Sequence, residues 1–233
     1  MTRLSYTRPV LLAGGGTLDA GMLAQGSSAA RVVHPEGAEA LIAADGAADR
    51  LAALGHLPDA VIGDMDSLED PAAWAARGVE VISLAEQDTT DFEKCLYSVA
   101  APLYLAAGFT GRRHDHMLAV FHTMLRRSDQ RVVLIAEEEV IALAPPGREI
   151  AISPGVGGRV SIFPLRALRC GPSAGLEWPV DGLSMAPGEA IGTSNRAVSD
   201  TVRLRFHDAG ALLMLEPAAL ESLVATLAGP EAS

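Results

Sequence analysis

The sequence is short of cysteine, of positive charge and of long hydrophobic runs, and each shortage argues against a class of protein. Its two cysteines, Cys95 and Cys170, lie far apart and in no metal-type spacing, which predicts reduced thiols in a cytoplasmic protein. No apolar run approaches the roughly 20 residues that span a bilayer. The first residues, where a short apolar run leads into glycines, do not have the pattern of a signal peptide. We therefore expect no membrane partner.

Positive charge is scarce, because 18 basic residues stand against 29 acidic ones and leave a net charge of −11. A nucleic-acid partner is not expected, since phosphate neutralisation needs a basic face. An acidic balance favours solubility, and it also suits cationic ligands or metals. Hydrophobic residues make up 49% of the 233-residue chain, which is enough for a core in one large domain or two small ones.

The first half of the sequence alternates strand-like and helix-like segments with short connections. This alternation predicts an α/β domain built on a mostly parallel, doubly wound sheet, in which ligands bind at the carboxyl ends of the strands. The expected strands are Val10–Ala13, Leu41–Ala44, Ala60–Gly63, Val79–Ser83, Leu103–Ala106 and Val132–Ala136. The expected helices are Ala47–Leu54, Pro71–Arg77, Asp91–Ala100 and Asp115–Arg126.

After about Glu137 the segments become short, rich in Val and Ile, and punctuated by Gly and Pro. Those turn signals predict an antiparallel β-sandwich. We expect Thr201–Phe206 and Ala211–Leu215 to form its last hairpin and Pro217–Leu227 to form a closing helix, with Pro217 in the first turn. The prediction is therefore two domains, α/β over residues 1–137 and β over residues 138–233.

Two glycine-containing turns follow the first two strands of the α/β half. Gly14 and Gly15 belong to a glycine run in which backbone N–H groups could approach a phosphate, although a bare glycine turn needs no ligand. Asp45, followed by Gly46, could hydrogen-bond a ribose or hold a metal-bound water. It could equally cap the helix that begins at Ala47, and from the position alone we favour the cap.

Asp64 and Asp66 follow the third strand with one residue between them. On an extended backbone residues i and i+2 point to the same side, so both carboxylates could face one hard cation. Two like charges repel at short range without a cation, and Mg²⁺ prefers such oxygen ligands. The alternative is a turn in which Asp66 or Ser67 caps the helix from Pro71.

Asp88 and Asp91 flank the start of the next expected helix, and their spacing resembles a capping box with Asp88 as N-cap. The same spacing would place both carboxylates on one side of the helix start. Further on, Arg113 suits phosphate oxygens and Asp115 offers one more carboxylate. His114 and His116 without a clear third protein ligand give little support for zinc.

These acidic and glycine-rich clusters occupy successive strand-to-helix turns of one expected sheet. If the strands are parallel, the turns share an edge of that sheet. Independent helix capping does not explain why so many carboxylates gather there, whereas a bound Mg²⁺–polyphosphate does.

The order of the motifs resembles the thiamine pyrophosphokinase family. The matching segments are ADGAADRL, PDAVIGDMDS, EQDTTDFEKCL and GRRHDHMLA, with GLEW and GTSN as looser matches in the β half. The resemblance implies an α/β domain followed by a β-sandwich, and a homodimer that binds thiamine between its subunits. It also implies transfer of a pyrophosphoryl group from Mg-ATP to the thiamine hydroxyl, with release of AMP.

The resemblance also implies roles for individual residues. Asp64, Asp66, Asp88 and Asp91 would hold Mg²⁺, and these four with Asp115 would form the catalytic set. ATP would be bound by Asp45, Gly46, Arg113 and His116. To these we add Gly14 and Gly15, on the basis of the glycine run itself rather than of the resemblance. Thiamine would be bound by a second group: Gln87, Thr193, Ser194 and Asn195.

Some positions depart from the family pattern. Ala47 and Asp49 replace a glycine and an asparagine, and Arg112 replaces a second glycine. An asparagine expected in the following helix is absent. Trp178 could stack on thiamine, but we favour a place for it in the core of the sandwich.

Three other functions remain open at this point. The protein could be a pyrophosphokinase for a different acceptor, such as a pterin. It could be a glycosyltransferase that uses a D-x-D motif, although that reading leaves EQDTTD and the β half unexplained. It could also be a non-catalytic sensor of a nucleotide or of thiamine.

Overall fold

The computed structural model describes residues 4–68, 70–111 and 113–229. The chain divides into two compact units, which we describe separately. Unit 1 comprises residues 1–123 and 134–137, and unit 2 comprises residues 124–133 and 138–233. The strand β8 (Val132–Ile135) and the helix α5 (His114–Arg126) cross the division between them.

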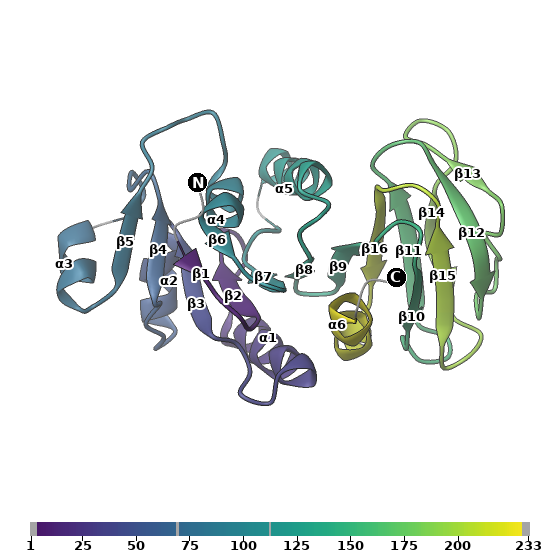
Figure 1. Ribbon diagram of the computed structural model, residues 1–233, viewed down its shortest axis with the longest axis horizontal. Coiled ribbons are helices and arrows are strands. Elements are labelled where there is room, and N and C mark those ends of the chain that lie inside the picture. The colour runs from purple at the N-terminus through teal and green to yellow at the C-terminus, as the bar shows by residue number, and fades with distance from the viewer. Residues whose placement is uncertain (1–3, 69, 112, 230–233) are drawn as a thin grey trace. The chain divides into compact units, whose positions relative to one another are not determined.

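Unit 1 is built on five parallel strands in the order β7-β2-β3-β4-β5 (Figure 1). These strands are β2 (Val10–Ala13), β3 (Ala40–Ala44), β4 (Ala60–Gly63), β5 (Glu80–Ser83) and β7 (Tyr104–Ala107). The helices that follow them are α1 (Ala20–Val33), α2 (Ala47–Ala53), α3 (Pro71–Ala76), α4 (Asp91–Ser98) and α5. A small separate pair joins β1 (Leu4–Ser5) to β6 (Val99–Ala100). The predicted parallel α/β architecture is confirmed.

Helix α1 has no counterpart among the helices expected from the sequence. Its 14 residues include Gly21 and Gly26, and such residues weaken a helix and are typical of loops. Tertiary packing overrides that tendency, because a Cβ on Gly26 would lie only 3.0 Å from the Leu11 side chain of β2. Asp19 caps the helix by accepting a hydrogen bond from the Met22 N–H.

Among its described residues, unit 2 contains two sets of antiparallel strands. One has the order β14-β11-β16-β9, with β9 (Val140–Leu143), β11 (Arg159–Pro164), β14 (Gly192–Arg196) and β16 (Ala211–Leu215). The other has the order β10-β15-β12-β13, with β10 (Glu149–Ile152), β12 (Leu168–Ala174), β13 (Ser184–Met185) and β15 (Val202–Phe206). A 3₁₀ turn, η1 (Pro217–Ala219), and the helix α6 (Leu220–Ala228) follow the last strand, where a closing helix was predicted.

The predicted hairpin between β15 and β16 is wrong, because the two strands lie in different sheets. The His207 N–H donates to the carbonyl of Arg169 in β12, so the chain leaving β15 stays hydrogen-bonded to the neighbouring strand of the same sheet. At the start of β16 the Gly210 carbonyl accepts from the Leu165 N–H next to β11. The four residues 207–210 therefore cross between sheets rather than fold back along one.

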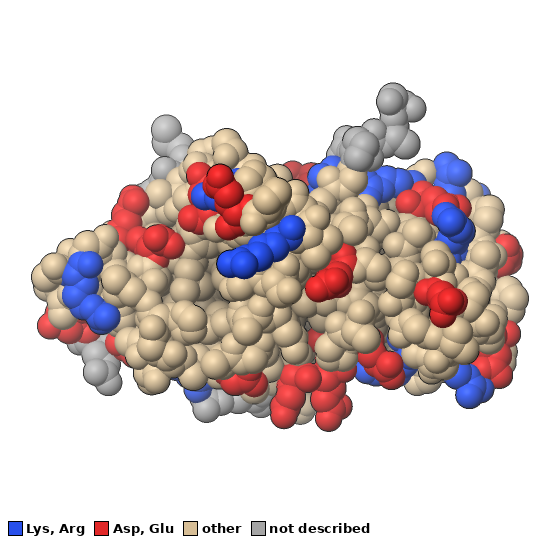
Figure 2. Space-filling model, turned by 90° about the horizontal axis from the view of Figure 1, so that it is seen from below, with Lys and Arg blue, Asp and Glu red and all other residues tan. Residues whose placement is uncertain are grey.

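The core of unit 1 packs α2 and α3 against the central strands. Ala47 and Leu51 of α2 are fully buried, and Trp74 of α3 is 4% exposed. Cys95 and Cys170 are both buried and free, as the sequence predicted. No helix within the described residues is long and apolar enough to cross a membrane. On the face in Figure 2, acidic and basic side chains are scattered among large neutral areas.

Candidate functional site

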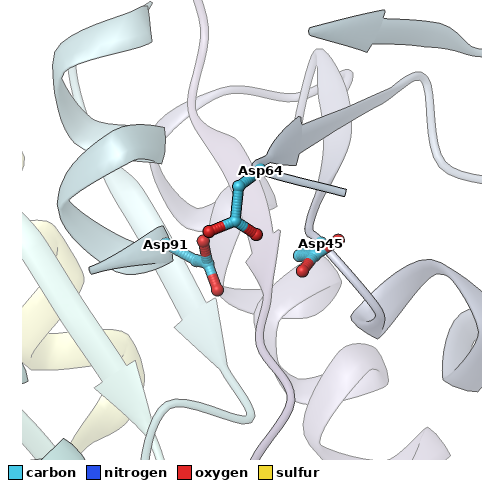
Figure 3. Close-up of side chains that lie close together, drawn as sticks. All are labelled: Asp45, Asp64 and Asp91. Carbon is cyan, nitrogen blue, oxygen red and sulfur yellow. The ribbon is translucent and has the colours of Figure 1, made fainter. Parts of the chain in front are cut away.

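Three carboxylates from separate turns meet at the carboxyl edge of the parallel sheet. Asp45 follows β3, Asp64 follows β4 and Asp91 is the first residue of α4. Each offers an oxygen atom within 4.8 Å of the others. Figure 3 shows the three side chains lying close together. We call this group the aspartate cluster. The prediction that acids from successive turns converge on one edge is correct, because β3 and β4 are parallel neighbours.

Two glycines allow the turns after β3 and β4 to approach each other. A Cβ on Gly63 would lie 2.7 Å from the Asp45 Cβ, and a Cβ on Gly46 would lie 2.6 Å from the Ser67 carbonyl oxygen. Contacts this short are essentially never found for real Cβ atoms. Asp45 itself has a φ of 45°, a left-handed conformation that Asp tolerates better than most residues. Local backbone geometry therefore positions this carboxylate.

Asp45 does not cap α2, contrary to the interpretation favoured from the sequence. The N-cap is Gly46, and Asp45 Oδ2 instead accepts a 3.2 Å hydrogen bond from the Ser67 N–H. Asp45 is 2% exposed, and its Oδ1 is a buried atom without a hydrogen-bond partner in the described part of the chain. Burial, together with the charges of Asp91 and Asp64 and contact with Asp66, raises the pKa of Asp45 to about 6.

Lys94 joins the other two carboxylates of the cluster. Its Nζ lies 3.1 Å from Asp64 Oδ2 and 3.4 Å from Asp91 Oδ1, and its side chain is 1% exposed. Gln87 Nε2 donates to the same Asp64 oxygen at 2.8 Å. Burial opposes ionisation of Asp64, but the hydrogen bonds from Lys94 and Gln87 outweigh it and hold the pKa of that carboxyl below its ordinary value.

At Asp91, in contrast, burial outweighs the interactions that favour the ionised carboxylate. Burial raises the pKa of Asp91, the ammonium of Lys94 only partly offsets it, and the charges of Asp64 and Asp66 add to the increase. Sequence reasoning did not select Lys94 as a site residue. Its position three residues after Asp91 in a helix was the available signal, since residues i and i+3 are neighbours on a helix.

Asp66 lies beside the aspartate cluster rather than within it. Met65 has a φ of 69°, so the backbone between Asp64 and Asp66 is not extended and the predicted same-side arrangement is wrong. Asp66 is exposed and accepts a 2.9 Å hydrogen bond from the Ser67 hydroxyl. Neither Asp66 nor Ser67 caps α3, whose N-cap is Asp70.

Asp88 is exposed on the loop before α4 and is not the N-cap of that helix. The cap is Thr90, whose hydroxyl accepts from the Glu93 N–H. Glu86 organises the loop by accepting hydrogen bonds from the Asp88 N–H at 3.0 Å and the Tyr97 hydroxyl at 2.7 Å. The loop thus keeps a defined conformation between β5 and α4, with Asp88 outside the aspartate cluster.

The glycine run after β2 has a structural explanation. The Gly14 N–H donates to the Ala107 carbonyl at 2.8 Å, and a Cβ on Gly14 would lie 2.5 Å from the Gly108 carbonyl oxygen. The N–H of Gly14, expected to contact a phosphate, is therefore used within the protein. Gly15 differs, because a Cβ placed there would meet no atom within 4 Å. Only the Gly15 side of this turn is open.

The turn before α5 carries an exposed ion pair. Arg113 Nη2 lies 2.6 Å from Asp115 Oδ2, and the two side chains are 64% and 66% exposed. The Arg113 guanidinium lowers the pKa of Asp115 to about 2. His116 is also exposed, and none of the three belongs to the aspartate cluster. Arg112, one of the departures from the family pattern, lies outside the described residues.

The other two departures lie at the start of α2. Ala47 is fully buried in the core of unit 1, where it packs with Leu51 and Val61. A methyl group therefore fills space at this position. Asp49 lies in the first turn of the helix, where an acidic residue is favoured by the helix dipole.

In unit 2 the expected thiamine residues all lie in β14. Thr193 and Ser194 are exposed, whereas Asn195 is 5% exposed. The Asn195 side-chain amide makes two hydrogen bonds to the Trp178 backbone. Its Oδ1 accepts from the Trp178 N–H at 3.2 Å and its Nδ2 donates to the Trp178 carbonyl at 2.6 Å. The Trp178 ring is 55% exposed with the Arg196 guanidinium 6.0 Å from its centroid, so the expected place in the core is wrong.

Comparison with known proteins connects this geometry to a family. Residues 35–135 match the family model described as the catalytic domain of thiamin pyrophosphokinase. Thiamine pyrophosphokinase 1 of Oryza sativa subsp. japonica is 32% identical over 169 residues, which make up 64% of this chain and 62% of that protein. Thiamine pyrophosphokinase 1 of Arabidopsis thaliana is 31% identical over 160 residues, 60% of this chain and 58% of the relative. The matches thus span about three fifths of the curated relatives.

Solved structures share the fold across nearly the whole chain. The thiamin pyrophosphokinase of Candida albicans matches with a TM-score of 0.73 at 14% identity, covering 92% of this chain and 93% of that one. The yeast enzyme matches with a TM-score of 0.72 at 17% identity, covering 97% and 94%. The family match includes all three residues of the aspartate cluster and Lys94. Residues 35–135 are thus similar to the catalytic domain of thiamin pyrophosphokinase, and the chain shares the fold of solved thiamin pyrophosphokinases.

Proposed function

We propose that this protein transfers the pyrophosphoryl group of Mg-ATP to the hydroxyl of thiamine, giving thiamine pyrophosphate and AMP. The observation that carries the proposal is the aspartate cluster, which brings three carboxylates of the matched catalytic domain to one edge of the sheet. Pyrophosphoryl transfer requires mainly positioning and neutralisation of charge around phosphorus. A set of fixed carboxylates that can hold a divalent cation suits that requirement.

The residues of the cluster fit Mg²⁺. They offer carboxylate oxygens, which Mg²⁺ prefers, and Asp45 Oδ1 is a buried acceptor without a partner among the described residues. Asp45, Asp64 and Asp91 would hold the ion. Asp66 and Asp88, which are exposed outside the aspartate cluster, would bind its waters. When bound, Mg²⁺ would neutralise charge on the phosphate oxygens.

ATP would lie along the same edge of the sheet. Arg113 is exposed and can offer its guanidinium to phosphate oxygens, with Asp115 holding its orientation and His116 on the same first turn of α5. The open side of Gly15 and the turn at Gly46 would face the nucleotide. The placements of Gly46, Arg113, Asp115 and His116 follow the family motifs, whereas that of Gly15 follows from the open side of its turn.

Thiamine would bind near Gln87, whose amide Nε2 is oriented by Asp64. In unit 2 we propose that Thr193 and Ser194 contact the pyrimidine, with the exposed Trp178 ring as the stacking candidate. Asn195 would not contact thiamine itself but would hold the Trp178 backbone in position through its hydrogen bonds. We further propose a homodimer with thiamine between its subunits, and an acidic surface that attracts the fixed positive charge of thiamine.

A carboxylate would accept the proton of the attacking hydroxyl, although a loose transition state makes a strong base unnecessary. Asp91 is the better placed of the two candidates. It lies in the cluster, and burial raises its pKa, whereas Asp88 is exposed on the preceding loop. Lys94 would hold Asp91 and Asp64 in position while the hydroxyl attacks the β-phosphorus in line and AMP leaves.

The decisive assay supplies purified protein with Mg-ATP and thiamine and measures thiamine pyrophosphate and AMP together. The two products should appear in equal amounts. Asp91→Asn and Asp66→Asn should lower turnover by roughly a hundredfold or more, as expected when charge stabilisation is lost. Asp200→Asn, an exposed acid in unit 2, is the matched control and should retain normal turnover.

The same assay separates the other functions considered for this sequence. Formation of AMP with a pterin but not with thiamine would show that the acceptor is a pterin. Binding of ATP or thiamine without AMP would indicate a sensor, and sugar transfer from a nucleotide-sugar would indicate a glycosyltransferase. Near-normal AMP release by Asp91→Asn would refute the proposed metal and proton-accepting roles.

A further inference from the structure

Lys94 has a property that no other position in this chain shares. It is the single lysine of the sequence, which carries 17 arginines at its other basic positions. Lysine is almost never fully buried unless it is paired, and here the ammonium is 1% exposed between two carboxylates. A compact ammonium and a planar guanidinium are not interchangeable at such a site. The one lysine thus lies where a small buried cation is needed.

The ammonium of Lys94 offsets the negative charge of two carboxylates of the aspartate cluster and leaves the third without a cation partner in the part of the chain that the structure describes. Asp64 Oδ2 accepts hydrogen bonds from both Lys94 and Gln87, and Asp91 Oδ1 lies 3.4 Å from the same ammonium. Asp45 Oδ1, in contrast, is buried with no partner in the described residues. One positive charge therefore faces three carboxylates, with Asp66 close by.

We propose that Lys94 is an internal counter-ion that limits the affinity of the aspartate cluster for a free divalent cation. Its ammonium holds Asp64 and Asp91 in place before substrate arrives and repels an incoming cation. The cluster consequently takes its metal as a complex with a nucleoside triphosphate, whose negative charge offsets the ammonium. This inference rests on the proposed role of the cluster as the metal site.

The physical argument is the Coulomb interaction at short range. A cation held by Asp64 and Asp91 must lie close to an ammonium that contacts both of them. At a separation of about 4–5 Å near a protein surface, loss of one positive charge should increase divalent-ion affinity by roughly tenfold or more. A lysine with a purely structural role predicts the reverse, because its loss would loosen the carboxylates and weaken binding.

The test is a titration of the full-length protein with Mn²⁺ alone, without nucleotide, followed by electron paramagnetic resonance. Lys94→Met should bind Mn²⁺ at least about tenfold more tightly than the wild type. Lys94→Arg keeps the charge and should stay within about threefold of the wild type while lowering the melting temperature. Arg203→Met, which removes a cation from an exposed ion pair in unit 2, should leave Mn²⁺ affinity unchanged.

A second measurement decides the question if Lys94→Met does not fold. Protein labelled with [¹³C]lysine gives one set of lysine side-chain signals, because Lys94 is the only lysine. Under the proposal these signals shift as Mg²⁺ is added, with the same midpoint as Mg²⁺ binding measured by calorimetry. Lysine signals that stay unchanged at saturating Mg²⁺ would refute the proposal.

The outcomes separate this inference from the proposed function. Unchanged or weaker Mn²⁺ binding by a folded Lys94→Met, beside measurable binding by the wild type, overturns the counter-ion role and leaves the metal site standing. If neither protein binds Mn²⁺, with or without ATP, the metal site itself is refuted, and the role of Lys94 with it.

Discussion

Acidic side chains at the carboxyl edge of unit 1 occupy two contrasting environments. In the aspartate cluster, Asp45 is 2% exposed and the cluster shares one buried ammonium. Before α5, Asp115 is 66% exposed and has its own guanidinium partner, Arg113. Screening by water makes an exposed pair contribute little to stability, whereas like charges that are partly buried depend on every neighbouring cation. The difference indicates that the cluster, rather than the exposed pair, is where a bound cation changes the energy of the protein.

The largest expected effect contrasts Asp64 with Asp115. Asp64→Asn should lower turnover by about 10²–10³-fold, since it removes a carboxylate that contacts both Lys94 and Gln87. Asp115→Asn should lower turnover by less than about 30-fold, because Arg113 keeps its charge. Measured values of kcat for the two purified variants test the contrast. An equal or larger loss in Asp115→Asn would reverse the ranking of the two regions.

The second prediction concerns pH and Asp45. A carboxyl whose pKa is raised in the folded protein, from 3.8 to about 6, stabilises the fold below the unfolded value, and this contribution is lost as pH rises through about 6. In metal-free buffer, Asp45→Asn should therefore become more stable relative to the wild type by about 1–3 kcal/mol between pH 4 and pH 7.

Urea denaturation of both proteins at the two pH values measures that difference. Saturating Mg²⁺ should reduce it, because the ion stabilises the ionised form of the carboxyl. Parallel stability curves for the wild type and Asp45→Asn across this range would show that Asp45 titrates as an ordinary exposed acid.

The smallest effect concerns the two glycines Gly63 and Gly15. Gly63→Ala places a methyl group 2.7 Å from the Asp45 Cβ and should destabilise the protein by about 1–3 kcal/mol while reducing turnover. Gly15→Ala points into open space and should change stability by less than about 0.5 kcal/mol. Chemical denaturation midpoints and turnover compare them. Equal stability and turnover of the two variants would mean that the turn at Asp45 can shift to make room for the added methyl group.

Most elements of unit 1 could be predicted from the sequence, because β2, β3, β4 and β7 are short apolar runs that end at or just before Gly or Asp. Helix α1 could not, since its glycines and serines are typical of a loop and only packing against β2 makes it helical. The pairing of β15 also could not, because an apolar alternation identifies a strand without identifying its partner.

The candidate site was predicted in part. Asp64 and Asp91 were correctly expected to converge, since both follow strands of one parallel sheet. Asp45 was assigned to the nucleotide, to a metal-bound water or to a helix cap, because nothing in ADG indicates a φ of 45°. Lys94 was overlooked, because the burial of its side chain depends on how α4 packs beside β4.

The sequence by itself determined the alternation of strands and helices in unit 1 apart from α1, the positions of acids after successive strands, and a set of motifs specific to one family. Only the tertiary structure decided which acids face one another. A positive φ at Asp45 and Met65, and the close approach that Gly63 permits, turn Asp45 inward and leave Asp66 beside the cluster. Side-chain direction depends on backbone torsions and on neighbours distant in the chain, and the spacing of residues along the sequence contains neither.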